Sequence, residues 1–194
     1  FVEKFFQIGD FVLGDNNISY FEKKIPGVSW DSSNKELHLK DAKIKATGEN
    51  IGLMPLFVSF DANIILEGDN VIEAEAVALQ NDKCIMHIVS QDGKGKLTLK
   101  STKDKGIYAL NNKGIYFSDI TLDVTAEKQA FYNEDVDTYF SDCVATLTGN
   151  GGGYFGAQYN AIIQLDNSFL TCTGSESGGK VNPSFWGYNN PCMW

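Results

Sequence analysis

The chain reads Ile115-Tyr116-Phe117-Ser118-Asp119 and then, 23 residues later, Thr138-Tyr139-Phe140-Ser141-Asp142. The same order of residue types, apolar-x-apolar-x-Asp/Asn, occurs at Leu37-His38-Leu39-Lys40-Asp41 and at Ile163-Gln164-Leu165-Asp166-Asn167. An alternating apolar segment follows every one of these steps. Alternation with a period of two is typical of a β-strand with one buried face. The repeat therefore predicts a strand, a corner at the Asp or Asn, and a second strand.

The corner interpretation rests on a slip in the alternation. Leu39 and Ala42 are both apolar although they lie three positions apart. Asp and Asn tolerate left-handed backbone and hydrogen-bond to nearby turn amides, so they suit a sharp change of direction. After Asp119 the alternation resumes with Ile120, Leu122 and Val124 on one face. Each slip therefore marks a turn between two strands.

The repeat length limits the choice of fold. The units recur every 22 to 30 residues or so, and no helical stretch lies between them. A leucine-rich repeat would show a regular leucine and asparagine framework, and a β-sandwich would not repeat its corner chemistry. We therefore predict an all-β, single-stranded, right-handed parallel β-helix, a solenoid of about six coils stacked about 4.8 Å apart. The expected parts are an N-terminal cap with entry strands (1–34), the coils (35–174) and a C-terminal cap (175–194).

Several segments resemble a known group of proteins. They are Gly27–Asp31, Lys35–Ala42, Ile64–Ile72, Gly95–Leu99 and Gly106–Tyr108. Their pattern is similar to that of right-handed parallel β-helix surface proteins of Bacteroidetes type, which are grouped as carbohydrate-binding domain-containing proteins. The resemblance implies an exported, surface-attached β-helix with a glycan-related role, and it carries over no catalytic residue.

Charge and composition exclude several classes of partner. The net charge is -9, with 25 acidic residues against 16 basic ones. All the basic residues are lysine, so a guanidinium fork on a phosphate or carboxylate is excluded. Nucleic acids and anionic membranes attract cationic surfaces, so neither is an expected partner. The expected partner is a polysaccharide or another cell-surface ligand, bound by a monomer.

The compartment is inferred from the ends and from hydropathy. No apolar run approaches the roughly 18 residues that span a bilayer. The chain starts at Phe1 rather than at a methionine. We therefore expect a mature form or an excised segment from which any signal peptide or anchor has been removed, and the resemblance implies an extracellular or cell-surface location.

Aromatic residues supply the candidate ligand-binding surface. Tyr116 and Tyr139 are outward-facing in the expected alternation and occupy equivalent positions in adjacent coils, so they should form a small ladder. Tyrosine combines a flat apolar surface with a polar tip, which suits sugars. The competing interpretation is that these tyrosines cover coil edges and that the C-terminal aromatics cap the solenoid. The candidate ligand-binding residues are Tyr108, Tyr116, Tyr132, Tyr139, Trp186 and Tyr188.

Acidic residues supply a candidate metal site. The densest group is Asn133–Asp137, shortly before Asp142. Several carboxylate oxygens from neighbouring turns would suit Ca²⁺. The competing interpretation is a solvated acidic turn, and no cofactor is required by the sequence. The candidate ligands are Glu134, Asp135, Asp137 and Asp142.

Enzyme chemistry has less support. Stacking would bring Asp119, Asp142 and Asn167 one above another, which is the one enzyme-like arrangement on offer, although each residue also suits its own corner. The glycines at 151, 153 and 156 match a dinucleotide fingerprint, but a strand rather than a helix is expected after them. Of the two histidines, His38 is expected to face outward and His87 inward. No catalytic residue is assigned.

Three functions remain, in order. The first is an exported non-catalytic domain that binds a glycan or another extracellular ligand. The second is a structural or adhesive spacer that recognises a protein. The third is a polysaccharide lyase or hydrolase.

Overall fold

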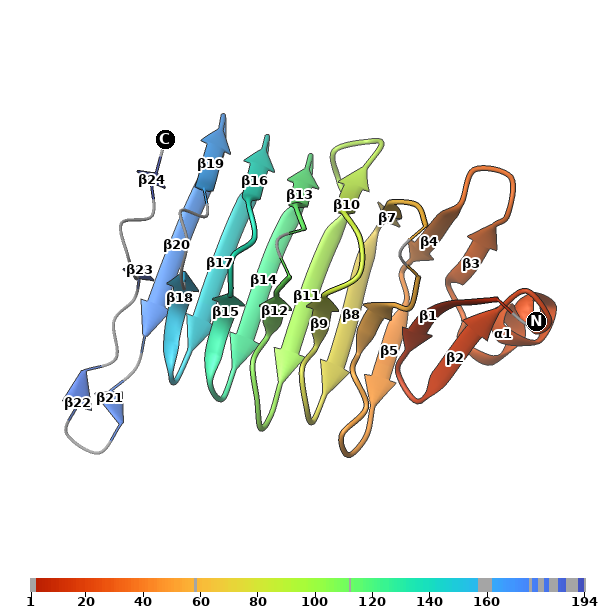
Figure 1. Cartoon of the computed structure of the whole chain (residues 1–194), viewed down its shortest axis with the longest axis horizontal. Helices are drawn as coiled ribbons and strands as arrows, with labels where there is room; N and C mark the ends of the chain where they lie inside the picture. Colours follow the sequence, from red (N-terminus) through yellow and green to blue (C-terminus); the bar gives the residue numbers. More distant parts are fainter. Residues whose placement is uncertain are drawn as a thin grey trace.

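The chain folds as a β-solenoid (Figure 1). The structure is a computed structural model that describes residues 3–57, 59–111, 113–156 and 162–174 in full. For residues 176–177, 180–181, 185–187 and 192–193 it describes only the backbone. In this part of the chain every coil contributes one strand to each of three sheets, here named A, B and C.

Sheet B leads each coil, sheet C follows and sheet A closes it. Sheet B has the order β24 (Cys192–Met193), β19 (Ile162–Asp166), β16 (Thr138–Ser141), β13 (Ile115–Ser118), β10 (Met86–Ser90), β7 (Ala62–Glu67), β4 (Glu36–Lys40), β3 (Val28–Asp31). Sheet C has the order β20 (Phe169–Gly174), β17 (Val144–Gly149), β14 (Thr121–Ala126), β11 (Lys96–Ser101), β8 (Asp69–Ala74), β5 (Lys43–Ala46). Sheet A has the order β2 (Phe11–Gly14), β1 (Lys4–Ile8), β6 (Leu53–Pro55), β9 (Leu79–Asn81), β12 (Ile107–Ala109), β15 (Gln129–Asn133), β18 (Gly152–Gly156), β23 (Phe185–Gly187).

The predicted all-β solenoid is confirmed, with about five turns rather than six. The regular turns run from β4 to β18, and β19 and β20 open a further one. The strands of these turns pair in parallel throughout, for example β13 with β16 and β14 with β17. A short antiparallel pair, β21 (Glu176–Ser177) and β22 (Lys180–Val181), follows β20.

The N-terminal elements pack against the first turn and run differently. Strand β1 is antiparallel to both β2 and β6, and β3 is antiparallel to β4. Between β2 and β3 lies the single described helix, α1 (Ile18–Lys24), which buries Phe21. Phe6 and Trp30 are buried at the same end, with ring centroids 5.9 Å apart. The described part of the predicted N-terminal cap, residues 3–34, thus lies at one end of the solenoid (Figure 1). Most of the predicted C-terminal cap, 175–194, lies outside the described residues.

The predicted corners are confirmed. Asp41, Asp119, Asp142 and Asn167 all adopt positive φ, between 45° and 56°. In the second turn Gly68 takes this place, with φ of 68°. Because few L-residues tolerate this conformation, the chain uses Asp, Asn or Gly wherever sheet B gives way to sheet C. The polar side chains also tie neighbouring coils together, since the Asp41 Oδ1 accepts the amide of Asp69 at 2.8 Å.

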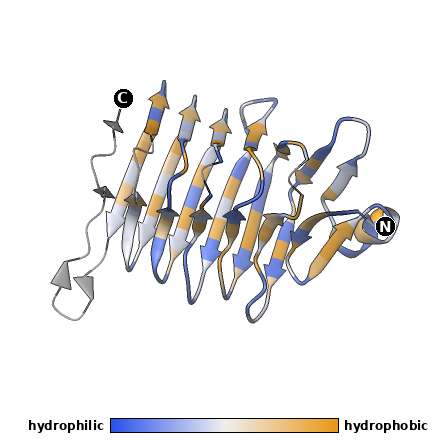
Figure 2. Ribbon diagram, viewed as in Figure 1, coloured by the Kyte–Doolittle hydropathy of each residue, from blue (hydrophilic) through white to orange (hydrophobic). Residues whose placement is uncertain are grey.

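The core is built from columns of inward side chains. Phe117 and Phe140 stack with centroids 4.9 Å apart and planes 11° apart, and both are buried. Figure 2 shows the corresponding alternation of hydrophobic and hydrophilic bands along the strands. Buried polar groups sit at the corner that leads from sheet A to sheet B. There the Asn133 Oδ1 accepts the amide of Val136 at 2.8 Å, and its Nδ2 donates to the Val136 carbonyl and to the Tyr154 hydroxyl.

No helix in the described part of the chain is long and apolar enough to cross a bilayer.

Candidate functional site

One row of outward side chains runs along sheet B and contains a residue from each of six successive strands. The parallel register sets the members level with one another, so neighbours lie one strand spacing apart. In an in-register parallel sheet this spacing is about 4.8 Å. This outer row consists of Glu36, Asn63, His87, Tyr116, Tyr139 and Gln164.

The centre of the outer row is a stack of three rings. His87 and Tyr116 have centroids 4.8 Å apart and planes 19° apart. Tyr116 and Tyr139 lie 4.5 Å apart with planes 3° apart. The predicted placement of Tyr116 and Tyr139 as a ladder is therefore confirmed. Because the rings cover each other's faces, the stack offers ring edges and hydroxyl groups to a ligand.

The prediction that His87 faces inward is wrong. Its side chain is 34% exposed, whereas Met86 and Ile88 on either side are buried. The stretch from Ile85 to Val89 is apolar except for the histidine, so the sequence gives no phase there. The phase is set by pairing, because His87 is level with Asn63 and Tyr116.

Carboxylates border the outer row. The Asp61 Oδ2 lies 3.6 Å from the His87 Nε2. Beside Tyr139, partial burial and the Asp137 carboxylate raise the pKa of the phenol. At the start of the row, the Glu36 Oε2 lies 3.2 Å from the His38 Nε2. The row therefore combines hydrogen-bonding aromatic groups with negative charge.

A pocket of about 330 Å³ opens on the same face of the solenoid. It lies over β4 and β7, between Ser29 of β3 and the loop that follows β10. Its apolar part includes Ile65, while Lys40 and Glu67 form an ion pair on its lining. The lining residues are Ser29, His38, Leu39, Lys40, Ile65, Leu66, Glu67, Gln91 and Asp92.

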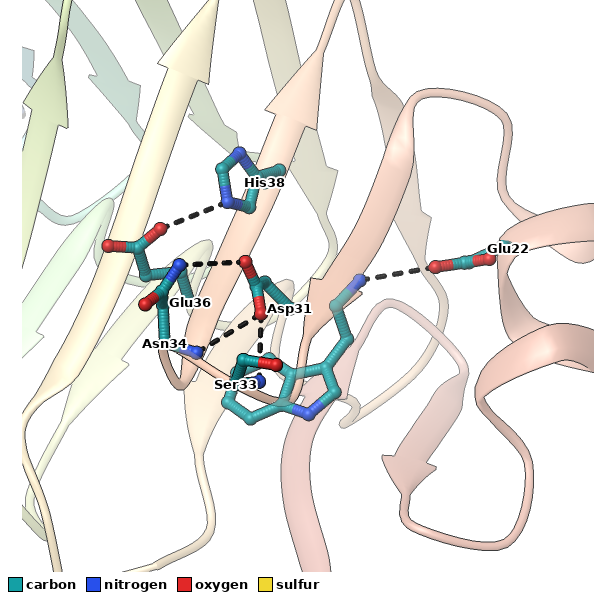
Figure 3. A network of polar contacts seen from close by, with 7 residues as sticks. Glu22, Asp31, Ser33, Asn34, Glu36 and His38 are labelled. Carbon is teal, nitrogen blue, oxygen red and sulfur yellow. Dashed lines mark hydrogen bonds and ion pairs between the residues drawn. The ribbon is translucent and has the colours of Figure 1, made fainter.

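A compact polar group lies beside the pocket, at the β3–β4 hairpin (Figure 3). Ligand atoms of Asp31, Glu36 and His38 all lie within 4.8 Å of one another. Both carboxylate oxygens of Asp31 already accept hydrogen bonds within the turn. Its Oδ1 accepts the amides of Ser33 and Asn34 at 2.8 and 3.1 Å, and its Oδ2 accepts the Asn34 side-chain amide.

These hydrogen bonds decide what Asp31 can do chemically. The backbone amides of Asn34 and Ser33 lower the pKa of the Asp31 carboxyl. A general acid for glycoside cleavage needs a raised pKa. Asp31 is therefore unsuited to the general-acid role, and both of its carboxylate oxygens already accept hydrogen bonds from the turn. The hydrogen bonds instead fix the hairpin that forms one wall of the pocket.

The predicted metal ligands lie in different places. Glu134 accepts a hydrogen bond from the Tyr108 hydroxyl at 2.9 Å, and the Asp137 Oδ1 accepts the amide of Ile162 at 3.0 Å. Asp142 accepts hydrogen bonds from Ser141 and Asn167 at the opposite end of β16. Asp135 takes the turn conformation, with φ of 95°. Within the described residues, the group close enough to share an ion is Asp31, Glu36 and His38, and it includes none of these four.

Two other predicted aromatic residues, Tyr108 and Tyr132, lie on sheet A. Tyr108 and Tyr132 meet edge to face at 5.6 Å, and Tyr132 stacks on Phe155 at 4.7 Å. The ammonium group of Lys105 lies 4.7 Å from the centre of the Tyr108 ring. Burial and the hydrogen bond to Glu134 raise the pKa of Tyr108 to about 12. On this surface the Tyr108 hydroxyl therefore already donates to Glu134, and the Lys105 ammonium group lies over the Tyr108 ring.

The side chains of two predicted ligand-binding residues, Trp186 and Tyr188, lie outside the described residues. The backbone of Trp186 pairs with Phe155 in sheet A, but its side chain lies outside the described residues. Tyr188 lies outside them altogether.

The residues predicted to form an enzyme-like column lie at the corners between sheets B and C. Asp119, Asp142 and Asn167 each adopt the left-handed corner conformation, and Asn167 donates its side-chain amide to Asp142. Gly153 and Gly156 lie within strand β18, and the next described element is strand β19, so a strand is found over the described part of the segment predicted to follow the glycines. Residues 157–161 lie outside the described residues. A dinucleotide site would need a helix there.

Sequence reasoning missed Glu36, Asn63 and His87 as members of the outer row, and it missed the pocket. The chain matches no protein-family model, no curated protein and no solved structure.

Proposed function

We propose that this chain is an exported, non-catalytic β-solenoid domain that binds a glycan at the cell surface. The ligand lies along the outer row of sheet B and reaches the pocket over β4 and β7. The domain acts as a monomer and requires no cofactor. The resemblance to carbohydrate-binding surface proteins supports the same function.

The outer row is the observation that carries this proposal. Six successive strands each place a polar or aromatic side chain at the same level. Their spacing of about 4.8 Å is close to the length of one sugar unit in an extended polysaccharide. A periodic ligand can thus meet one side chain of the row at each successive sugar unit.

The chemistry of the row suits a sugar hydroxyl. Tyr116 and Tyr139 supply phenol groups, Asn63 and Gln164 supply amides, and His87 supplies an imidazole. Each group donates or accepts hydrogen bonds without a metal. The tyrosine edges add apolar contact area at low conformational cost, because the stacked rings are already held in place.

The test compares two aromatic pairs on different sheets. The variant is Tyr116→Ala with Tyr139→Ala, and the control is Tyr108→Ala with Tyr132→Ala on sheet A. Retention is measured by affinity electrophoresis in gels that contain xylan, glucomannan or soluble chitosan, and by pull-down on cellulose and chitin. We expect the sheet B variant to lose retention while its thermal unfolding stays nearly unchanged, and the sheet A control to keep retention.

Four other results bear on the alternatives. Loss of retention in the sheet A control alone would move the site to that sheet. Retention of the natural chain on none of these polysaccharides would contradict glycan binding and leave the spacer function. Release of reducing ends or unsaturated sugars would contradict the non-catalytic proposal. We expect retention to be unchanged when EDTA is added. Loss of retention in EDTA would support Ca²⁺ as a cofactor.

A further inference from the structure

Negative charge is concentrated on the face that carries the outer row. The residues considered are those of the row, those that contact its members, and those that line the pocket. Among the described lysines, Lys40 belongs to this set of residues, and it forms an ion pair with Glu67. The carboxylates in the same set of residues are those of Asp31, Glu36, Asp61, Glu67, Asp92 and Asp137.

The outer face of sheet C provides a comparison within the same molecule. Its charges alternate and neutralise one another. The Lys96 Nζ lies 2.7 Å from the Asp123 Oδ2, and Lys103 pairs with Glu75. A hollow of about 390 Å³ on this face is lined by Lys45, Glu73, Glu75 and Lys103 among others. The acidic excess on sheet B is therefore a local feature and does not simply follow from the net charge of the chain.

Unneutralised carboxylates select the charge of a ligand. Asp61 and Asp137 lie beside opposite ends of the ring stack, next to His87 and Tyr139. A uronic acid or sulfated sugar placed on the row would be repelled by both. A protonated amino group would be attracted, and it can donate up to three hydrogen bonds to carboxylate, phenol or amide oxygens.

From this charge pattern we infer that the glycan bound by sheet B carries free amino groups, as in a glucosamine polymer. The inference rests on the proposed glycan-binding function and names its ligand class. The carboxylates of Asp61 and Asp137 bind the ammonium groups, while the ring edges of Tyr116 and Tyr139 contact the sugar rings.

The experiment uses two polymers with the same backbone. Chitosan carries free amino groups, whereas chitin carries the uncharged acetylated form. The full chain is tested against particles of both, and against polygalacturonate gel as an anionic polymer. We expect retention on chitosan at least about tenfold stronger than on chitin at low salt, weakening as salt is added.

Two variants with the same net charge separate a specific site from general attraction. Asp61→Asn with Asp137→Asn removes two negative charges from the sheet B face, and Glu73→Gln with Asp123→Asn removes two from sheet C. Asparagine at 137 keeps an oxygen that can accept the Ile162 amide, so we expect this variant to fold. We expect about a tenfold loss of chitosan binding in the first variant and almost none in the second. Circular dichroism checks that both variants fold.

The possible outcomes separate the inferred ligand class from glycan binding in general. Equal losses in the two variants would show non-specific attraction by net charge and overturn the inference. Equal retention on chitin and chitosan would overturn it while leaving glycan binding intact. Preference for polygalacturonate would do the same. Failure to bind any polysaccharide would overturn both the inference and the proposed function.

Discussion

Replacement of Asn133 by alanine tests how the solenoid tolerates polar side chains in its core. Asn133 is fully buried at the end of β15. Its Oδ1 accepts the Val136 amide at 2.8 Å, and its Nδ2 lies 2.6 Å from the Val136 carbonyl and 2.8 Å from the Tyr154 hydroxyl. Asn133→Ala removes these bonds and leaves both backbone groups of the buried Val136 without their asparagine partner.

The same molecule holds a matched control. Asn81 is level with Asn133 two coils away, and Ala109 of the intervening coil lies between them. Asn81 is also fully buried, but its Oδ1 has no hydrogen-bond partner among the described residues, and its Nδ2 donates to the Cys84 carbonyl at 2.8 Å. The presence of Ala109 at this level shows that an alanine fits the stack.

The two substitutions should therefore differ in cost. A buried polar group left without a partner costs about 1–3 kcal/mol, so Asn133→Ala should destabilise the fold by about 3 kcal/mol. Asn81→Ala loses one hydrogen bond but also removes an unpaired buried oxygen, so it should cost at most about 1 kcal/mol. Urea unfolding followed by circular dichroism measures both. Equal losses, or a larger loss for Asn81→Ala, would refute this reasoning.

Two further predictions concern stability. Asp10 ties the β1–β2 turn to the loop after β5, because its carboxylate accepts the Thr47 amide at 2.7 Å and the Asn50 side-chain amide at 2.9 Å. These bonds lower the pKa of Asp10 from 3.8, so their stabilisation is present above that pH and is lost as the pH falls through the lowered value. Asp10→Asn should thus flatten the fall in Tm below about pH 5, and an unchanged pH profile would contradict this role. At Gly106, a Cβ would lie 2.2 Å from the Val124 Cγ1 and 2.6 Å from the Ala130 carbonyl oxygen. Gly106→Ala should therefore cost about 1–3 kcal/mol by overpacking, whereas an unaltered urea midpoint would show that the coil spacing can expand.

The solenoid was predictable because its corners repeat in the sequence. A short polar residue between two alternating runs marks each corner, and Asp41, Asp119, Asp142 and Asn167 all adopt the left-handed conformation. The level of Tyr116 with Tyr139 follows from the same count. Side chains near regular corners can thus be placed from the sequence alone.

Register between irregular turns was not predictable. Counting back from the corners would set His38 level with Tyr116, because each lies three residues before its aspartate. Pairing instead sets Glu36 in the row, since β4 runs further before it turns. Adjacency in sequence misled in the same way at the acidic segment, where Glu134 contacts Tyr108 and Asp137 contacts the amide of Ile162.

The most direct test of glycan binding by sheet B is an NMR titration of isotope-labelled protein with glucosamine oligomers. The ring resonances of His87, Tyr116 and Tyr139 should shift as the oligomer is added, while those of Tyr108 and Tyr132 stay in place. Shifts confined to Tyr108 and Tyr132, or none at concentrations where chitosan retains the protein, would contradict a binding site on the outer row.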